Sequence, residues 1–222
     1  MSLTYAIGDI HGALHKLQDL LVRCEGHAAG RARRYVFLGD YIDRGPDSAG
    51  VVRVLREMAT QLPDVAAGVV TIMGNHEAML LATFDGAIEP ANWIGQGGAM
   101  TLRSYGVAQA RELPPDDVDW LRALPLSHDD GRRLFVHAGI DPRRPLDAQD
   151  EEDLLWIREP FLAEGRDYGR LIVHGHTPLA SGMPDLRTNR LNLDTGAVFG
   201  GPLTAAVFCD DATPPVTFLQ SK

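Results

Sequence analysis

Residues 35–45, YVFLGDYIDRG, contain the pattern that decides how the chain folds. The apolar run Tyr35–Leu38 is rich in β-prone side chains and predicts a buried strand. The run ends at Gly39, and Asp40, Asp43 and Arg44 follow closely. Carboxylates and a guanidinium at the carboxyl end of a strand predict a ligand site, because that end of the strands is where open α/β sheets bind ligands.

The same pattern follows four other apolar runs. Each run has the length of a strand and is followed by side chains that can bind a metal: Asp9 and His11 after Leu3–Ile7; Asn75, His76 and Glu77 after Val69–Met73; His137 after Leu134–Val136; His174 and His176 after Leu171–Val173. Since the carboxyl ends of parallel strands meet at one edge of a sheet, we expect these distant residues to converge.

Taken singly, these residues have ordinary structural explanations. A histidine at a strand end is more often a hydrogen-bonded core residue than a ligand, and an aspartate after glycine usually closes a turn or caps a helix. The glycine before the polar residue also fits an ordinary turn. The recurrence at five strand ends therefore carries the prediction of a site, rather than any one motif.

The remaining apolar pattern predicts the fold class. Further strands are expected at Leu191–Leu193, Leu203–Phe208 and Val216–Leu219. A helix is expected over Ala13–Cys24, and a second one from Asp47 or Ser48, with Leu62 as its last apolar residue. Residues 93–105 are expected to form a loop and then a helix. Strands that first alternate with helices and then follow one another predict an α/β domain whose C-terminal part adds antiparallel strands.

Composition excludes several protein classes. With 222 residues, 45% hydrophobic and 23% charged, the chain suits one globular domain rather than a disordered or fibrous protein. The net charge of −9 argues against nucleic acid as a general partner. Cys24 and Cys209 are expected to be free thiols in the core, and neither a membrane span nor a signal peptide is visible. These features predict a cytoplasmic protein with no membrane partner.

The candidate ligands combine oxygen and nitrogen donors without cysteine. This donor set suits divalent manganese, iron or zinc better than copper or an iron–sulfur cluster. The two carboxylate oxygens of Asp40 could bridge two ions about 3.5–4 Å apart, which is the arrangement that activates water and clamps a phosphoryl group. Signatures of other chemistries, namely GxxxxGK[ST], GxSxG and HExxH, are absent from the sequence.

Together these motifs resemble those of the phosphoprotein phosphatase branch of the calcineurin-like metallophosphoesterases. The similarity extends from residue 7 to about residue 208 and rests on GDIHG (8–12), GDYIDRG (39–45), GNHE (74–77), HAG (137–139) and GHTP (175–178). Residues 193–201, LDTGAVFGG, are similar to the C-terminal part of small bacterial and phage serine/threonine protein phosphatases.

The resemblance implies a fold and a metal-ligand set. The fold would be a β-sandwich of two mixed sheets flanked by helices, with residues 1–222 in a single domain and an insertion at residues 84–130 that frames the site. Asp9, His11 and Asp40 would hold one divalent ion. Asp40, Asn75, His137 and His176 would hold the second. The two ions are expected to be manganese, with iron or zinc as alternatives.

The resemblance also implies the catalytic roles. A hydroxide that bridges the two ions would attack phosphorus in line, without a covalent phosphoenzyme. His76 would act as the general acid, oriented by Asp43, while Arg44 and Arg158 would bind phosphate oxygens. Two positions depart from the family pattern: Met73 stands where larger protein phosphatases have arginine, and His174 is not a family ligand and is expected to lie in the core or behind the ligands.

Three functions remain open on the sequence. The first is a phosphoserine/phosphothreonine protein phosphatase, whose substrate would be a phosphorylated protein or a small phosphoester. The second is a diadenosine tetraphosphate (dinucleoside polyphosphate) hydrolase, which shares most of the motifs. The third is a non-catalytic scaffold on the same fold, which is disfavoured because every expected position is filled. Glu77, the His137-Ala138-Gly139 motif and Pro178 favour the protein phosphatase.

Overall fold

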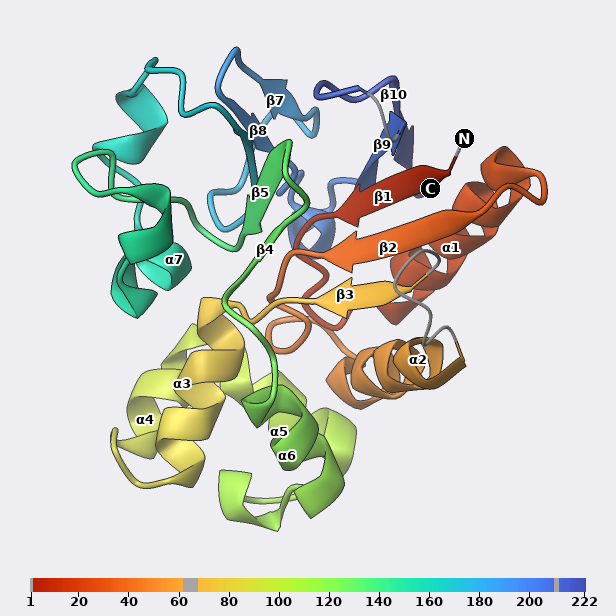
Figure 1. Cartoon of the computed structure of the whole chain (residues 1–222). Helices are drawn as coiled ribbons and strands as arrows, with labels where there is room; N and C mark the ends of the chain where they lie inside the picture. The colour runs from red at the N-terminus through yellow and green to blue at the C-terminus, as the bar shows by residue number, and fades with distance from the viewer. Residues whose placement is uncertain (1, 62–67, 210–211) are drawn as a thin grey trace.

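Two mixed β-sheets of five strands each form the centre of the structure (Figure 1). The computed structural model describes residues 2–61, 68–209 and 212–222. The first sheet has the order β10-β9-β1-β2-β3. Its strands are β1 (Leu3–Ile7), β2 (Arg33–Phe37), β3 (Val69–Thr71), β9 (Thr204–Cys209) and β10 (Thr217–Gln220). Strands β1, β2 and β3 are parallel, whereas β9 and β10 join as antiparallel neighbours.

The second sheet has the order β4-β5-β6-β8-β7. Its strands are β4 (Ser127–Asp129), β5 (Arg133–Val136), β6 (Leu171–His174), β7 (Asp185–Leu186) and β8 (Arg190–Asn192). Here β5, β6 and β8 are parallel, and the short edge strands β4 and β7 are antiparallel to their neighbours. Each sheet therefore has three parallel strands in a row, and their carboxyl ends are available for one shared site.

The strand sequences explain why the sheets pack against each other. Side chains alternate between the two faces of a strand, so Tyr5 and Ile7 of β1 join the core under the helices while Ala6 faces the other sheet. The hydrophobic core between the sheets takes residues from both of them, among them Val36 of β2 and Phe135 of β5. Burying both faces of a sheet requires such nearly continuous hydrophobic strands.

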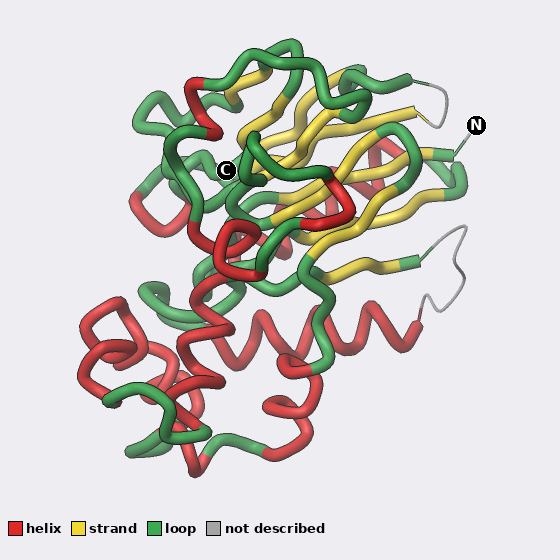
Figure 2. The backbone as a smooth tube through the Cα atoms, turned by 60° about the vertical axis from the view of Figure 1, so that its left-hand side comes forward, coloured by secondary structure: helices red, strands yellow, loops and turns green. Residues whose placement is uncertain are grey.

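The helices fall into three groups (Figures 1 and 2). Helices α1 (Leu14–Ala28) and α2 (Ser48–Gln61) bury their apolar faces in the core on the outer side of the first sheet. A second group lies below the strands in Figure 1 and comprises α3 (Asn75–Phe84), α4 (Pro90–Trp93), a π-helical turn (Ile94–Gly98), α5 (Ala99–Tyr105) and α6 (Pro115–Arg122). Helix α7 (Glu151–Trp156) lies beside the second sheet. Short 3₁₀ turns occur at Ala110–Glu112, Leu146–Ala148, Phe161–Ala163 and Ala197–Phe199.

The structure confirms the α/β sandwich and all eight predicted strands, with ends that shift by a few residues. Helix α1 continues to Ala28, four residues beyond the expected end, and α2 begins at Ser48. Leu62 lies outside the described residues. The prediction of a loop from residue 93 is wrong. Trp93 ends α4, and residues 94–98 form a π-helical turn, kinked at Gly97, that keeps the backbone hydrogen-bonded between α4 and α5.

Strands β4 and β7 were not predicted. Their residues are mostly polar and at least partly exposed, so no run of apolar side chains marks them.

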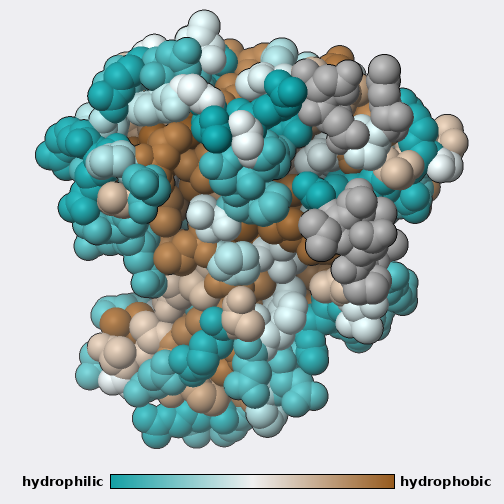
Figure 3. Space-filling view, viewed as in Figure 1, coloured by the Kyte–Doolittle hydropathy of each residue, from teal (hydrophilic) through white to brown (hydrophobic). Residues whose placement is uncertain are grey.

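Cys24 is a buried free thiol as expected, whereas Cys209 is free but only half-buried. Hydrophobic residues gather near the middle of the face shown in Figure 3, and polar ones dominate its outline. Among the described residues, no helix has both the length and the apolar character needed to cross a bilayer.

Candidate active site

The carboxyl ends of strands from both sheets bring the predicted ligands together. Asp9 and Asp40 follow β1 and β2, Asn75 opens α3 after β3, and His137 and His176 follow β5 and β6. All six predicted metal ligands are buried, with at most 7% of any of them exposed: Asp9, His11, Asp40, Asn75, His137 and His176. Polar side chains buried to this extent need partners or a cation.

The backbone of the site is strained. Six described non-glycine residues have a left-handed φ, and five of them are predicted site residues: His11, Asp40, Asp43, Arg44 and His176. Such conformations cost free energy in non-glycine residues and persist where the surrounding structure enforces them. The loops after β1, β2 and β6 therefore hold these side chains in the site, although a different backbone conformation would be lower in free energy.

Glu77 fixes the loop that carries Asp40. Its buried carboxylate accepts hydrogen bonds from the backbone N–H groups of Gly74 at 2.9 Å, Asp40 at 2.8 Å, Tyr41 at 2.8 Å and Ile42 at 3.3 Å. A Cβ atom on Gly74 would lie 2.3 Å from the backbone nitrogen of Asp40, so only glycine permits this close approach. The GNHE motif thus holds the loop after β2 against the start of α3.

His11, Asp40 and His76 form one group whose donor atoms lie within 4.8 Å of one another. The Nδ1–H of His11 donates to the carbonyl of Ile42 at 2.8 Å, which leaves its Nε2 lone pair directed at the site, 3.3 Å from Oδ2 of Asp40. Burial lowers the pKa of His11 to about 3. The imidazole is therefore neutral at pH 7, which is the form that binds a metal.

Asp40, His137 and His176 form the second group. The Nδ1–H of His137 donates to the carbonyl of Leu38 at 2.8 Å, and its Nε2 atom lies 2.8 Å from Oδ1 of Asn75 and 3.4 Å from Oδ1 of Asp40. Nδ1 of His176 lies 3.0 Å from the same Asn75 oxygen. Burial lowers the pKa of His137, and it lowers that of His176 to about 3.

These contacts fit a pair of cations. Asp40 belongs to both groups and can bridge two ions, and a lone pair of His137 faces the oxygens of Asn75 and Asp40 with no proton between them. Asp9 is not in the first group, but its carboxylate accepts the backbone N–H of His176 at 3.1 Å. Burial and the nearby carboxylates of Asp194 and Asp40 raise the pKa of Asp9. Divalent ions would relieve this crowding of negative charge.

His76, a member of the first group, forms a buried pair with Asp43. Nδ1 of His76 lies 2.6 Å from Oδ2 of Asp43, and the ring of His76 meets that of His11 edge-on, with 4.7 Å between ring centroids. Burial opposes a charge on His76, but the Asp40 carboxylate and the hydrogen bond to Asp43 outweigh it and raise the pKa of His76. The pair therefore favours the imidazolium, which can donate a proton through Nε2.

The two predicted arginines differ in their surroundings. Nη1 of Arg44 lies 2.7 Å from Nε2 of His11, and its guanidinium carbon is 5.6 Å from the centre of the Phe199 ring. Arg158 is exposed, just after α7. Its charge adds to the effects of burial and His137 that lower the pKa of His176. The Arg44 guanidinium thus lies against a predicted ligand, where it could reach a phosphate, and Arg158 is near enough for its charge to act on His176.

The positions that three residues take near the ligands were not predicted from the sequence. Glu77 could have been recognised as the third residue of a helix that opens at Asn75, where a glutamate often binds back to the cap. Asp194 follows the predicted strand Leu191–Leu193, so it shows the same pattern as the other strand ends. Trp93 is buried and donates to Asp43, and no sequence signal indicates this contact.

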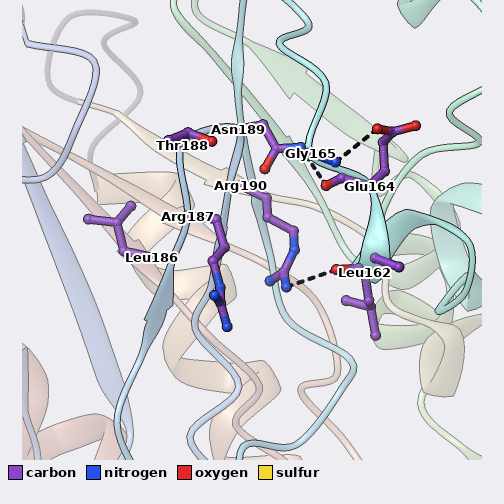
Figure 4. A pocket seen from close by; sticks show the side chains of 9 residues that line it. Leu162, Glu164, Gly165, Leu186, Arg187, Thr188, Asn189 and Arg190 are labelled. Carbon is purple, nitrogen blue, oxygen red and sulfur yellow. Dashed lines mark hydrogen bonds between the residues drawn. The ribbon is translucent and has the colours of Figure 1, made fainter.

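Two other features lie behind or away from the ligands. His174 is fully buried, its ring packs edge-on against Phe161, and it belongs to neither ligand group, as expected. A cavity of about 730 Å³ is lined by residues 162–165 and 186–190 (Figure 4). Arg187 and Arg190 in its wall both pair with Asp185, and none of its lining residues belongs to a ligand group, so this cavity is not the candidate site.

Two mixed sheets with ligand groups that share one aspartate at the strand ends define a metal-dependent phosphoester hydrolase. The calcineurin-like phosphoesterase family matches residues 3–208, and the chain belongs to this family. The serine/threonine-protein phosphatase 1 of Salmonella typhimurium is 30% identical over 214 residues, which cover 91% of this chain and 90% of that protein.

Other relatives carry a different activity in their names. The symmetrical bis(5'-nucleosyl)-tetraphosphatase of Dechloromonas aromatica is 33% identical over 143 residues, which cover 63% of this chain. The chain spans only 45% of that relative's length. The crystal structure of a putative diadenosine tetraphosphatase aligns over 99% of this chain and 94% of its own, with a TM-score of 0.73 and 25% identity. A Saccharomyces cerevisiae protein serine/threonine phosphatase shares the fold, with a TM-score of 0.67 and 16% identity.

Proposed function

We propose that this protein is a metal-dependent phosphomonoesterase of the serine/threonine protein phosphatase type. The observation that carries the proposal is the buried His76–Asp43 pair, whose histidine lies against His11 and Asp40, the aspartate that the two candidate ligand groups share. An acid next to a metal pair suits hydrolysis of an ester whose leaving group is an alkoxide, because an alkoxide needs a proton as it departs.

The side chains of this chain divide the remaining work. Asp9, His11, Asp40, Asn75, His137 and His176 would hold two divalent ions. When bound, the ions would lower the pKa of a water and neutralise phosphate charge. Arg44 and Arg158 would hold phosphate oxygens, and His76, oriented by Asp43, would protonate the leaving oxygen. We propose manganese as the ion, with iron or zinc as alternatives, since the donors are oxygen and nitrogen without sulfur.

The protein phosphatase type is supported by the extent of the similarity. The Salmonella phosphatase is covered over nine-tenths of its length, whereas the Dechloromonas tetraphosphatase is covered over less than half. We also propose that residues 1–222 form one domain with residues 84–130 as an insertion that frames the site. Two free cysteines support a reducing compartment such as the cytoplasm.

A dinucleoside polyphosphate hydrolase is the second candidate. It is favoured by the solved putative diadenosine tetraphosphatase, which aligns with nearly the whole chain. The two candidates are separated by comparing kcat/KM for a phosphoserine peptide, p-nitrophenyl phosphate and diadenosine tetraphosphate with the manganese-loaded protein. Our proposal expects cleavage of the phosphopeptide to be the more efficient. Efficient cleavage of the dinucleotide alone would establish the second candidate instead.

A further inference from the structure

The carboxylate of Asp43 is held by more than His76. Its Oδ2 atom also accepts the indole Nε1–H of Trp93 at 2.8 Å, and its Oδ1 atom accepts the hydroxyl of Thr101 at 2.6 Å. Asp43, Trp93 and Thr101 are each at most 1% exposed. The carboxylate is thus surrounded by three protein donors, and both of its oxygens are fixed.

Both additional donors come from the proposed insertion at residues 84–130. Trp93 ends α4 and Thr101 lies in α5, on either side of the π-helical turn. A Cβ atom on Gly98 would lie 2.4 Å from the indole of Trp93, so the glycine lets the indole pack directly against the backbone. The kinked turn therefore brings two donors from separate helices to one carboxylate.

The direction of each hydrogen bond follows from the number of protons available. The Thr101 hydroxyl has one proton, which goes to Oδ1 of Asp43 because a carboxylate only accepts. The Thr101 oxygen in turn accepts the backbone N–H of Asp43 at 2.9 Å and the hydroxyl of Ser48 at 3.1 Å. Because Asp43 has a left-handed φ of 70°, its backbone N–H and its carboxylate both hydrogen-bond to the hydroxyl of Thr101.

From this network we infer that Trp93 and Thr101 are positioning residues for the general acid: they hold the Asp43 carboxylate so that His76 points its Nε2 atom at the leaving oxygen. The inference rests on the acid role proposed for His76. Without the Thr101 hydroxyl, Oδ1 of Asp43 loses its hydroxyl donor, and without Trp93, Oδ2 loses one of its two donors. His76 would then lose its orientation while the six proposed metal ligands keep theirs.

The test compares two substrates with different leaving groups. Serine alkoxide in a phosphopeptide needs a proton as it leaves, whereas p-nitrophenolate is stable without one, so poor positioning of the acid slows the peptide reaction selectively. We expect Thr101→Val and Trp93→Phe each to lower kcat for the phosphopeptide about 10- to 100-fold more than kcat for p-nitrophenyl phosphate. Thr101→Ser, which keeps the hydroxyl, should restore most of the lost rate.

Matched controls and a second readout separate positioning from general damage. Thr83→Val removes a buried hydroxyl that donates to the Met79 carbonyl, and Trp120→Phe changes a half-buried indole on α6, so both should leave the substrate ratio unchanged. In NMR spectra of the metal-free protein, the Nδ1 proton of His76 should exchange with water faster in Thr101→Val than in the wild type.

Each outcome decides a different claim. The test requires that His76→Asn is selectively impaired on the peptide. In that case the positioning role is overturned if Thr101→Val and Trp93→Phe lose activity equally on both substrates or lose none. If His76→Asn itself keeps full activity on the peptide, the acid role proposed for His76 fails, and the inference fails with it.

Discussion

Nε2 of His137 lies 2.8 Å from Oδ1 of Asn75, although neither atom has a proton to donate. The histidine gives its Nδ1 proton to the carbonyl of Leu38, and burial lowers its pKa, so Nε2 carries a lone pair at neutral pH. Two lone pairs at this distance repel each other unless a cation lies between or beside them. The contact is thus the most direct sign in the structure that these side chains are shaped for a metal ion.

Loss of the acid should leave the metal ligands intact. We expect His76→Asn to lower kcat for a phosphoserine peptide about 10²- to 10⁴-fold, which is the usual contribution of a well-placed general acid. Metal content by elemental analysis should equal that of the wild type, since the six proposed ligands are unchanged. Full activity at unchanged metal content would remove His76 from the mechanism.

Arg44 should contribute to binding phosphate more than to stability. Replacing it by alanine removes charge-assisted hydrogen bonds worth about 1.5–3 kcal/mol, so the inhibition constant of inorganic phosphate should rise roughly 10- to 100-fold. Arg143→Ala is the matched control, because that side chain is 79% exposed and pairs with Asp141. An unchanged inhibition constant in Arg44→Ala would show that this guanidinium does not contact the phosphate.

Glu77 should be needed for folding of the loop that carries Asp40. In Glu77→Gln one carboxylate oxygen becomes an amide, so two of the four backbone N–H groups lose their acceptor. At about 1–3 kcal/mol for each buried unsatisfied group, the free energy of unfolding in urea should fall by about 2–6 kcal/mol. The exposed Glu89→Gln serves as the control, and equal stability of the two variants would contradict this role.

Asp130 should stabilise the protein at neutral pH and lose this effect at low pH. Burial opposes its charge, but hydrogen bonds from the Arg133 side chain and from the backbone N–H groups of Arg132 and Arg133 outweigh burial and lower the pKa of Asp130. A carboxyl whose pKa is lowered on folding contributes stability above its unfolded pKa of about 3.9, and this contribution is lost as the pH falls through the folded value.

Chemical denaturation of Asp130→Asn at several pH values tests this. The variant should be less stable than the wild type by about 1.5–3 kcal/mol at pH 7, and the difference should shrink as the pH falls below the unfolded pKa. The control variant Asp147→Asn, which changes an exposed carboxylate, should show no comparable difference in stability from the wild type at any of these pH values. A deficit in Asp130→Asn that stays constant down to low pH would mean that packing, rather than charge, explains the effect.

The strands that carry the site, and the polar residues that follow them, were predictable because each such segment has a clear sequence signature. The run Tyr35–Leu38 alternates between two buried faces, and the residues after it are too polar for a core, so both the strand and the site at its end follow from one segment. Asp194 obeys the same rule after β8 and could have been included. The edge strands β4 and β7 lack the signature because their side chains are largely exposed.

The surroundings of Asp43 were not predictable from the sequence. Trp93 and Thr101 reach it across 50 and 58 residues, through a helical turn of the rare π type. A tryptophan and a threonine near glycines suit a loop, a core or a substrate contact equally well. Only the tertiary packing of α4 and α5 against the loop after β2 brings these donors to the carboxylate.

The central claim is that two metal ions share Asp40, and electron paramagnetic resonance of the metal-free protein titrated with Mn²⁺ tests it most directly. We predict uptake of two ions per chain, with the spectrum of a spin-coupled pair appearing as the second equivalent binds and phosphatase activity rising with it. Binding of a single ion, or of two ions that give only the spectrum of isolated Mn²⁺, would contradict the claim.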